Sequence, residues 1–187
     1  GGSQGAASLN QWVKEHLEGF AADGISVYCL TGIGHESSGV IEMTSSDGAS
    51  IPMRFVPFSD VMSTVLSAAD LVISRAGAGS ISEIVRCRVP SILVPYPFAA
   101  DNHQALNASF IEQKGAAIVC PQDQIGELLF EEAREVMFNE EFRAVLRRNL
   151  VAIDPGDVVS EIAFDVTNVL KESGNLDVVA GALPFAG

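Results

Sequence analysis

Short apolar runs alternate along the chain with stretches in which apolar residues recur every three or four positions. The short runs are typical of buried strands, and the longer spacing is typical of amphipathic helices. Strands are expected at residues 25–30, 51–56, 71–73, 91–95 and 117–120, and helical patterns at residues 9–20, 61–66, 102–114 and from 122 onward. Because strands that alternate with helices pair in parallel through right-handed crossovers, we predict an α/β fold with a doubly wound, Rossmann-like parallel sheet.

Residues 34–50 interrupt this alternation. They are polar, punctuated by glycines and only weakly periodic, so we interpret them mainly as a mobile connection. His35 in this segment could be catalytic, but a solvated loop histidine is the commoner case, and nothing nearby completes a triad.

The junction at residues 70–83 is the main candidate for a binding site. Its buried strand stops at Gly77 and Gly79, whose lack of a Cβ lets the backbone turn tightly and approach a ligand. Ser80 or Ser82 is expected to cap the helix that follows. Helix N-termini at the carboxyl edge of a parallel sheet present free N–H groups, so this junction could hold an anion.

Two further loops, at residues 1–5 and 96–104, are expected at the same edge and also carry small or hydrogen-bonding residues. The first loop is rich in glycine and opens a helix, which suits a phosphate cradle but more often marks only a tight turn. It lacks the G-x-G-x-x-G spacing of a dinucleotide site.

The composition suits a single folded domain without a broad basic surface. Hydrophobic residues make up 48% of the 187 residues, and the mean hydropathy is +0.27. Eleven lysines and arginines against 24 acidic residues give a net charge of −13, which argues against binding to nucleic acid or anionic lipid. Any phosphate must therefore be held locally, by helix N-termini and backbone amides.

The three cysteines point to a reducing compartment. Cys29, Cys87 and Cys120 are odd in number, widely spaced and set in apolar surroundings, so we expect reduced thiols and a cytosolic location. A glycosylation motif at Asn107 is discounted because it lies in a helical pattern. The sequence carries no signal peptide, and it opens without methionine or a strand before its first glycines, so we expect a piece of a longer protein.

Three motifs occur in a recognisable order. They are Gly-Gly-Ser-Gln-Gly-Ala at residues 1–6, Ser-Arg-Ala-Gly-Ala-Gly-Ser-Ile-Ser-Glu at 74–83, and Asp-Asn-His-Gln at 101–104 with Asn107 and Ala108 after it. With them the chain resembles the C-terminal, donor-binding domain of the bacterial MurG family, the N-acetylglucosaminyltransferases of glycosyltransferase family 28 with the GT-B fold. The resemblance implies that residues 1–172 form one half of a GT-B glycosyltransferase. Residues 173–187 lack periodicity, so we expect a tail that is flexible or docked on a segment outside this sequence.

The resemblance also implies roles for individual residues in binding UDP-GlcNAc or UDP. The implied donor-binding residues are Ser3, Gln4, Phe58, Ser59, Ala78, Gly79, Ser80, Glu83, His103 and Gln104. Ser3 and the amides around it would lie near the diphosphate, and the backbone near Phe58 would meet the uracil edge. Glu83 would accept both ribose hydroxyls, and His103 and Gln104 would face the sugar, Gln104 with both a donor and an acceptor.

Several of these residues also have a simpler interpretation. Glu83 could be an ordinary carboxylate in or near the first turn of its helix, which the helix dipole favours. Arg75 could clamp a pyrophosphate or could pair with an acidic neighbour, and the two alternatives stand equal. Asp101 could be a base, yet a helix N-cap explains it as well.

The implied function is the donor half of an inverting transfer that converts lipid I to lipid II in peptidoglycan synthesis, at the cytoplasmic face of the inner membrane. The catalytic base, the lipid-linked acceptor site and the membrane contact would belong to a missing N-terminal domain. No metal-binding Asp-x-Asp pair is evident, and we expect neither a metal nor a cofactor. The alternatives are a UDP-GlcNAc 2-epimerase-like isomerase domain and a nucleotide-sugar-binding subunit of a bipartite transferase.

Overall fold

The computed structural model describes residues 3–33, 38–99, 102–154 and 156. The chain divides into two compact units, Gly1–Ile153 and Asp154–Gly187, and the first unit is described below. The helical pattern expected after residue 155 and the tail expected at residues 173–187 lie outside the described residues.

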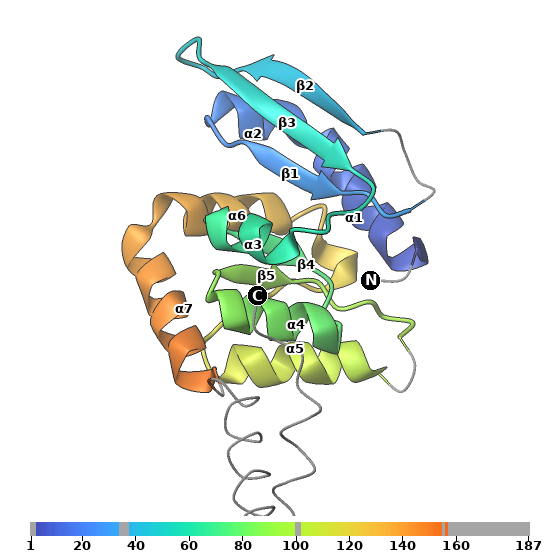
Figure 1. Ribbon diagram of the computed structural model, residues 1–187, viewed down its shortest axis with the longest axis vertical. Helices are drawn as coiled ribbons and strands as arrows, with labels where there is room; N and C mark the ends of the chain where they lie inside the picture. The colour runs from blue at the N-terminus through green and yellow to red at the C-terminus, as the bar shows by residue number, and fades with distance from the viewer. Residues whose placement is uncertain (1–2, 34–37, 100–101, 155, 157–187) are drawn as a thin grey trace, which may run out of the picture. The chain divides into compact units, whose positions relative to one another are not determined.

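Helices and strands alternate along the first unit, as the sequence pattern predicted (Figure 1). The first half contains α1 (Ser3–Glu15), α2 (Leu17–Ala22), β1 (Val27–Leu30), β2 (Gly39–Thr44), β3 (Ser50–Val56) and α3 (Met62–Ala68). The second half contains β4 (Val72–Ser74), α4 (Ala78–Cys87), β5 (Ser91–Leu93), α5 (His103–Gln113), β6 (Ile118–Val119), the 3-10 helix η2 (Gln122–Gln124), α6 (Leu129–Phe138) and α7 (Glu140–Ile153). The α/β class is confirmed.

The strands β4, β5 and β6 form a parallel sheet with β5 in the middle. Ile92 and Val94 lie in a core cluster with residues of α1, α2, α6 and the first three strands, whereas Leu93 lies in a second cluster with residues of α3, α4, α5 and α7. Neighbouring side chains of a strand point to opposite faces. The sheet is therefore covered on both faces, as a doubly wound fold requires.

The other three strands pair in the order β1, β3, β2. β1 and β3 are parallel, but β2 is antiparallel to β3, and Gly48 in the tight turn between them has a φ of 89°. The interpretation of residues 34–50 as mainly a mobile connection is wrong, because residues 39–44 form this strand. Five of its six residues are exposed, so neither face of β2 is buried and its sequence lacks the apolar alternation that marks a strand.

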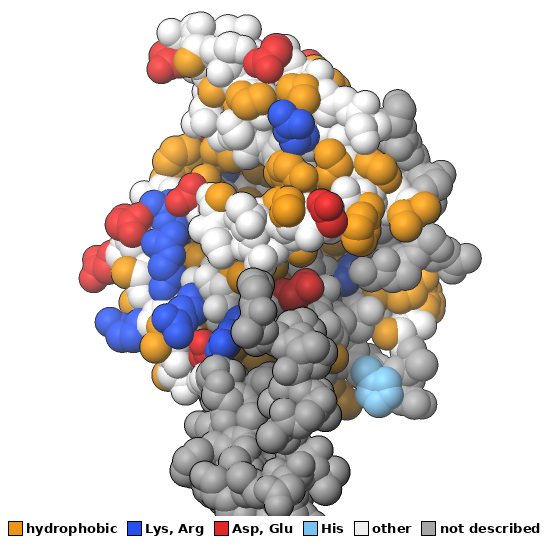
Figure 2. All heavy atoms as spheres, viewed as in Figure 1, with side chains coloured by type: hydrophobic (Ala, Val, Ile, Leu, Met, Phe, Trp, Pro, Cys, Tyr) orange, Lys and Arg blue, Asp and Glu red, His pale blue; other side chains and the backbone are white. Residues whose placement is uncertain are grey.

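One face of this β1–β3–β2 sheet remains open. Ile51, Met53 and Phe55 of β3 are buried, and the alternate positions of the strand face solvent. Figure 2 shows hydrophobic side chains gathered over this sheet, and Tyr28 and Val40 are among the exposed ones.

The described part of the chain contains no helix long and apolar enough to cross a membrane.

Candidate functional site

The buried side chain of Arg75 joins three segments at the carboxyl ends of β4 and β5. Arg75 is 5% exposed, and its Nη1 donates to the carbonyl oxygens of Val94 at 3.0 Å and Pro95 at 3.4 Å. Its Nη2 donates to Oγ of Ser8 in α1 at 2.7 Å, and its Cζ lies 5.5 Å from the centre of the Tyr96 ring. Burial lowers the pKa of the Arg75 guanidinium, which makes these acceptors necessary to hold its charge inside the protein.

These contacts give Arg75 a role that neither sequence-based alternative described. Its side chain binds backbone carbonyls and a serine hydroxyl inside the protein, and its small exposed area leaves little of it to meet a pyrophosphate. Ser8 was not among the predicted site residues. Its Oγ in turn donates to Oε1 of Gln122 at 3.3 Å, so the segment before α6 is joined as well.

The helix α4 begins earlier than the serines suggested. Its N-cap is Gly77, with φ −68° and ψ 144°, and its first residue is Ala78. The prediction that Ser80 or Ser82 caps this helix is therefore wrong, and the hydroxyl of Ser82 donates to the carbonyl of Ala78 at 3.0 Å. Gly77 has no side chain that could accept from the first-turn N–H groups, so the sequence pattern could not reveal it as the cap.

Gly77 and Gly79 are not required by the local backbone. The φ of Gly77 is one that any residue adopts, and Gly79 is the second residue of α4, where the backbone is helical and does not require glycine. A Cβ built on either glycine would meet nothing within 4 Å. Both glycines therefore border open space beside the free N–H groups of the first helical turn, which is the arrangement that a close-approaching anion uses.

Glu83 lies in the second turn of α4, and the first turn contains no acidic residue. Its side chain is exposed. The dipole effect falls off within the first turn of a helix, so the simpler interpretation of Glu83 as a first-turn carboxylate is not supported by its position.

Side chains in the first half of α5 form hydrogen bonds with the loops after β4 and β5. Oε1 of Gln104 accepts a hydrogen bond from the backbone N–H of Tyr96 at 3.0 Å, and Nδ2 of Asn107 donates to the carbonyl of Ala76 at 3.1 Å. The N-cap of α5 is Asn102, in a left-handed conformation with φ 57°. The alternatives for Asp101 lie outside the described residues.

The remaining predicted residues are less closely connected to this cluster. Phe58 and Ser59 follow the carboxyl end of β3, where Phe58 is 66% exposed and Oγ of Ser59 accepts from the N–H of Val61 at 3.3 Å. Among the described residues no hydrogen bond joins them to the loops after β4 and β5. His103 is exposed at the first position of α5.

Two predicted residues near the N-terminus are described only by their backbone. Ser3 and Gln4 occupy the first turn of α1, and nothing is described of their side chains. His35 lies outside the described residues. The described part of the chain contains no group of three or more His, Cys, Asp or Glu side chains placed to hold a metal ion.

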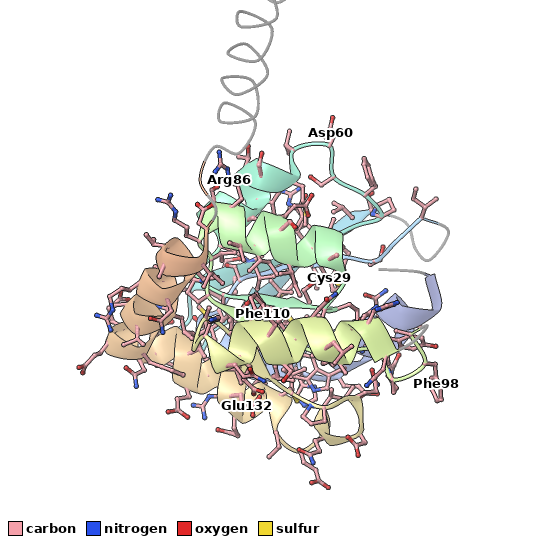
Figure 3. The ribbon with its side chains drawn as sticks, turned by 90° about the horizontal axis from the view of Figure 1, so that it is seen from below. Cys29, Asp60, Arg86, Phe98, Phe110 and Glu132 are labelled. Atoms are coloured by element: carbon pink, nitrogen blue, oxygen red, sulfur yellow. The ribbon has the colours of Figure 1, made fainter. Side chains whose placement is uncertain are left out.

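Two exposed aromatic side chains lie near the start of α5 and on it, Phe98 and Phe110. Figure 3 shows Phe98 beyond the N-terminal end of α5 and Phe110 on the helix itself. They are 82% and 57% exposed, respectively. Phe98 also packs edge-on against Tyr96, the aromatic residue over which Arg75 lies, with ring centres 5.7 Å apart.

The fold and this cluster define an α/β domain in which loops at the carboxyl ends of parallel strands meet the N-termini of helices. Residues 1–152 match the family model described as the glycosyltransferase family 28 C-terminal domain. The chain belongs to this family, and the resemblance inferred from the three motifs is confirmed.

Two curated relatives with the same name align with most of this chain. The chain is 41% identical over 174 residues to the UDP-N-acetylglucosamine–N-acetylmuramyl-(pentapeptide) pyrophosphoryl-undecaprenol N-acetylglucosamine transferase of Opitutus terrae, covering 93% of this chain and 46% of that protein. The protein of the same name from Sorangium cellulosum is 34% identical over 173 residues, covering 91% of this chain and 43% of that protein. The chain thus spans about half the length of these relatives.

Among solved structures, the crystal structure of Acinetobacter baumannii MurG aligns with 58% of this chain and 30% of that chain. The sequence identity is 31% and the TM-score is 0.49.

Proposed function

We propose that the chain binds UDP-GlcNAc as the donor half of an inverting N-acetylglucosaminyltransferase that converts lipid I to lipid II in peptidoglycan synthesis. The observation that supports this proposal is that the Arg75 side chain connects α1 with the loops after β4 and β5 through hydrogen bonds. These loops lie beside the open space at Gly77 and Gly79. The names of the relatives supply the donor and the lipid-linked muramyl-pentapeptide acceptor.

In this proposal the diphosphate lies at helix N-termini. The N–H groups of Ala78, Gly79 and Ser80 belong to the first turn of α4, where a helix leaves its N–H groups without partners. Ser3 and Gln4 occupy the same position in α1. Backbone amides can hold a diphosphate despite the net charge of −13, because their partial charges act at contact distance.

The nucleoside and the sugar would lie on either side of the diphosphate. The exposed carboxylate of Glu83 would accept the two ribose hydroxyls, and the backbone at Phe58 and Ser59 would meet the uracil. His103 and Gln104 would contact the sugar. Oε1 of Gln104 accepts from Tyr96, so the two N–H donors of this amide would face the sugar, and the second lone pair of Oε1 would still allow it to accept from a sugar hydroxyl.

The chemistry would be divided between two halves of a longer protein. As the acceptor hydroxyl attacks the anomeric carbon, a base must take its proton while UDP departs. The amides of α4 would stabilise the negative charge that develops on UDP, without a metal or cofactor. We place the base, the acceptor site and the membrane contact in the other half, at the cytoplasmic face of the inner membrane, and propose residues 1–172 as the donor domain with a tail at 173–187.

Calorimetric titration of the 187-residue chain with UDP-GlcNAc and with UDP tests the proposal. We expect both to bind, and Glu83→Ala to weaken both about tenfold or more because each contains the ribose. Glu127→Ala is the matched control, since Glu127 is an exposed carboxylate in the segment before α6. Absence of binding, or equal binding by the Glu83 and Glu127 variants, would reject the assignment. Release of N-acetylmannosamine by the longer protein would favour the isomerase alternative.

A further inference from the structure

We infer that Arg75 is a positioning residue of the donor site, which sets the relative placement of the nucleotide-binding and sugar-binding loops without touching the ligand. This inference rests on the proposed function. Arg75 is 5% exposed, and its described contacts run to Ser8, to two backbone carbonyls and to the Tyr96 ring.

The contacts of Arg75 lead directly to both sides of the proposed site. On one side, Arg75 precedes Ala76, whose carbonyl accepts from Asn107, and Gly77, which caps α4. On the other side, the guanidinium lies over the ring of Tyr96, and the N–H of Tyr96 donates to Oε1 of Gln104. Arg75 therefore connects the start of α4, which its backbone reaches through Ala76 and Gly77, with Gln104, which its side chain reaches through the packed ring and the backbone N–H of Tyr96.

An arginine is needed here because several acceptors surround one buried charge. The carbonyls of Val94 and Pro95 and the hydroxyl of Ser8 lie in different directions, and the planar guanidinium carries five N–H donors in a fixed arrangement that can meet them together. A lysine keeps the charge but is a compact point donor on a flexible stem. The Arg75→Lys variant thus keeps the positive charge and loses the planar arrangement of donors, so it tests the geometry apart from the charge.

The sugar contribution to binding is the quantity that isolates this role. It is the ratio of the dissociation constant for UDP to that for UDP-GlcNAc, because only the second ligand reaches Gln104 in the proposed site. We expect both Arg75→Lys and Gln104→Ala to lower this ratio at least threefold. In the double variant the ratio should fall no further than in Gln104→Ala alone, because both changes act through the same amide.

The control is Arg148→Lys, which changes an exposed arginine of α7 in the same way and should leave both dissociation constants unchanged. Ser8→Ala removes one acceptor while keeping Arg75 and should lower the ratio less than Arg75→Lys does, which keeps the inference testable if Arg75→Lys does not fold. A folded Arg75→Lys variant with a lower melting temperature but an unchanged ratio would overturn the inference, as would independent, additive losses in the double variant. If the unaltered chain binds neither ligand, the proposed function fails and this role fails with it.

Discussion

The backbone N–H of Tyr96 donates a hydrogen bond to Oε1 of Gln104, so the loop after β5 fixes the orientation of a side chain at the start of α5. The bond length is 3.0 Å, and Gln104 is half-buried. In this orientation Oε1 faces the Tyr96 N–H, and the amide nitrogen carries the two N–H donors of Gln104 that we propose for the ligand.

Replacing Gln104 by glutamate tests this orientation. Gln104→Glu keeps an oxygen for the Tyr96 N–H but removes the two N–H donors, so the proposed site loses the donor contacts of Gln104 with the sugar. We expect calorimetry to give an affinity for UDP-GlcNAc about tenfold lower, with the affinity for UDP within about twofold of the unaltered chain. An equal loss for both ligands would contradict the placement of Gln104 at the sugar.

The aromatic packing between α2 and α6 predicts a cost for a single methyl group. A Cβ on Gly19 would lie 2.6 Å from Cζ of Phe130, whose ring packs edge-on against Phe20 with centres 5.0 Å apart. We expect Gly19→Ala to lower the free energy of unfolding by about 1–3 kcal/mol, measured in urea. Gly126→Ala is the control, because a Cβ there meets nothing within 4 Å, and it should change stability by less than about 0.5 kcal/mol.

A second stability prediction concerns Glu132, which Figure 3 labels on the side of the molecule where α5 and α6 lie. Burial is the main cause that raises the pKa of Glu132, and the charges of Glu112 and Glu135 raise it further. Its Oε2 is buried without a hydrogen-bond partner among the described residues. The folded carboxyl holds its proton more tightly than the unfolded one, so ionised Glu132 destabilises the fold above the raised pKa, and this effect disappears below the ordinary value of 4.5.

We therefore expect Glu132→Gln to raise the melting temperature by about 2 °C at pH 7.5 and to leave it unchanged at pH 4. Glu127→Gln, at an exposed position, should have no such pH-dependent effect. A stabilisation of equal size at both pH values would assign the effect to packing instead of charge.

The Cys120 thiol should be chemically inert. Burial, followed by the negative charges of Glu132 and Asp123, raises the pKa of Cys120 to about 11. At pH 8 about one thiol in a thousand would then be ionised, and the side chain is fully buried. We expect iodoacetamide to modify half-buried Cys87 well before Cys120, as peptide mass spectrometry can measure in one sample. Faster modification of Cys120 would contradict the burial of this thiol.

The sequence predicted the strands and helices whose buried positions form a recognisable pattern of apolar residues. Ile92, Leu93 and Val94 are consecutive and apolar, and the structure buries them on both faces of β5. The helical pattern at residues 102–114 is also confirmed, because α5 spans His103–Gln113 and is followed by Gly115, whose φ of 62° is typical of a glycine just after a helix. The strand β2 was missed because most of its side chains are exposed, so no alternation of apolar and polar residues accompanied its backbone pairing.

The sequence predicted where the candidate site lies but not how its residues contact one another. The glycines and serines at 77–82 indicated a helix start but not which residue begins it, because a glycine cap leaves no side-chain signature. The network around Arg75 joins residues far apart in the sequence, with Ser8 and Arg75 separated by 67 positions. A periodicity argument covers only local spacing, so it could place Arg75 at the end of β4 but could not name its partners.

The burial of β5 on both faces also has a dynamic consequence for the first unit. Ile92 and Leu93 belong to different core clusters. When one cluster opens, the other therefore still packs against the strand and holds it in the sheet. The amide hydrogens of β5 should therefore exchange with deuterium only when both clusters open together. The slowest exchange in the protein should occur in this strand, and its rate should report the free energy of the global opening of Gly1–Ile153.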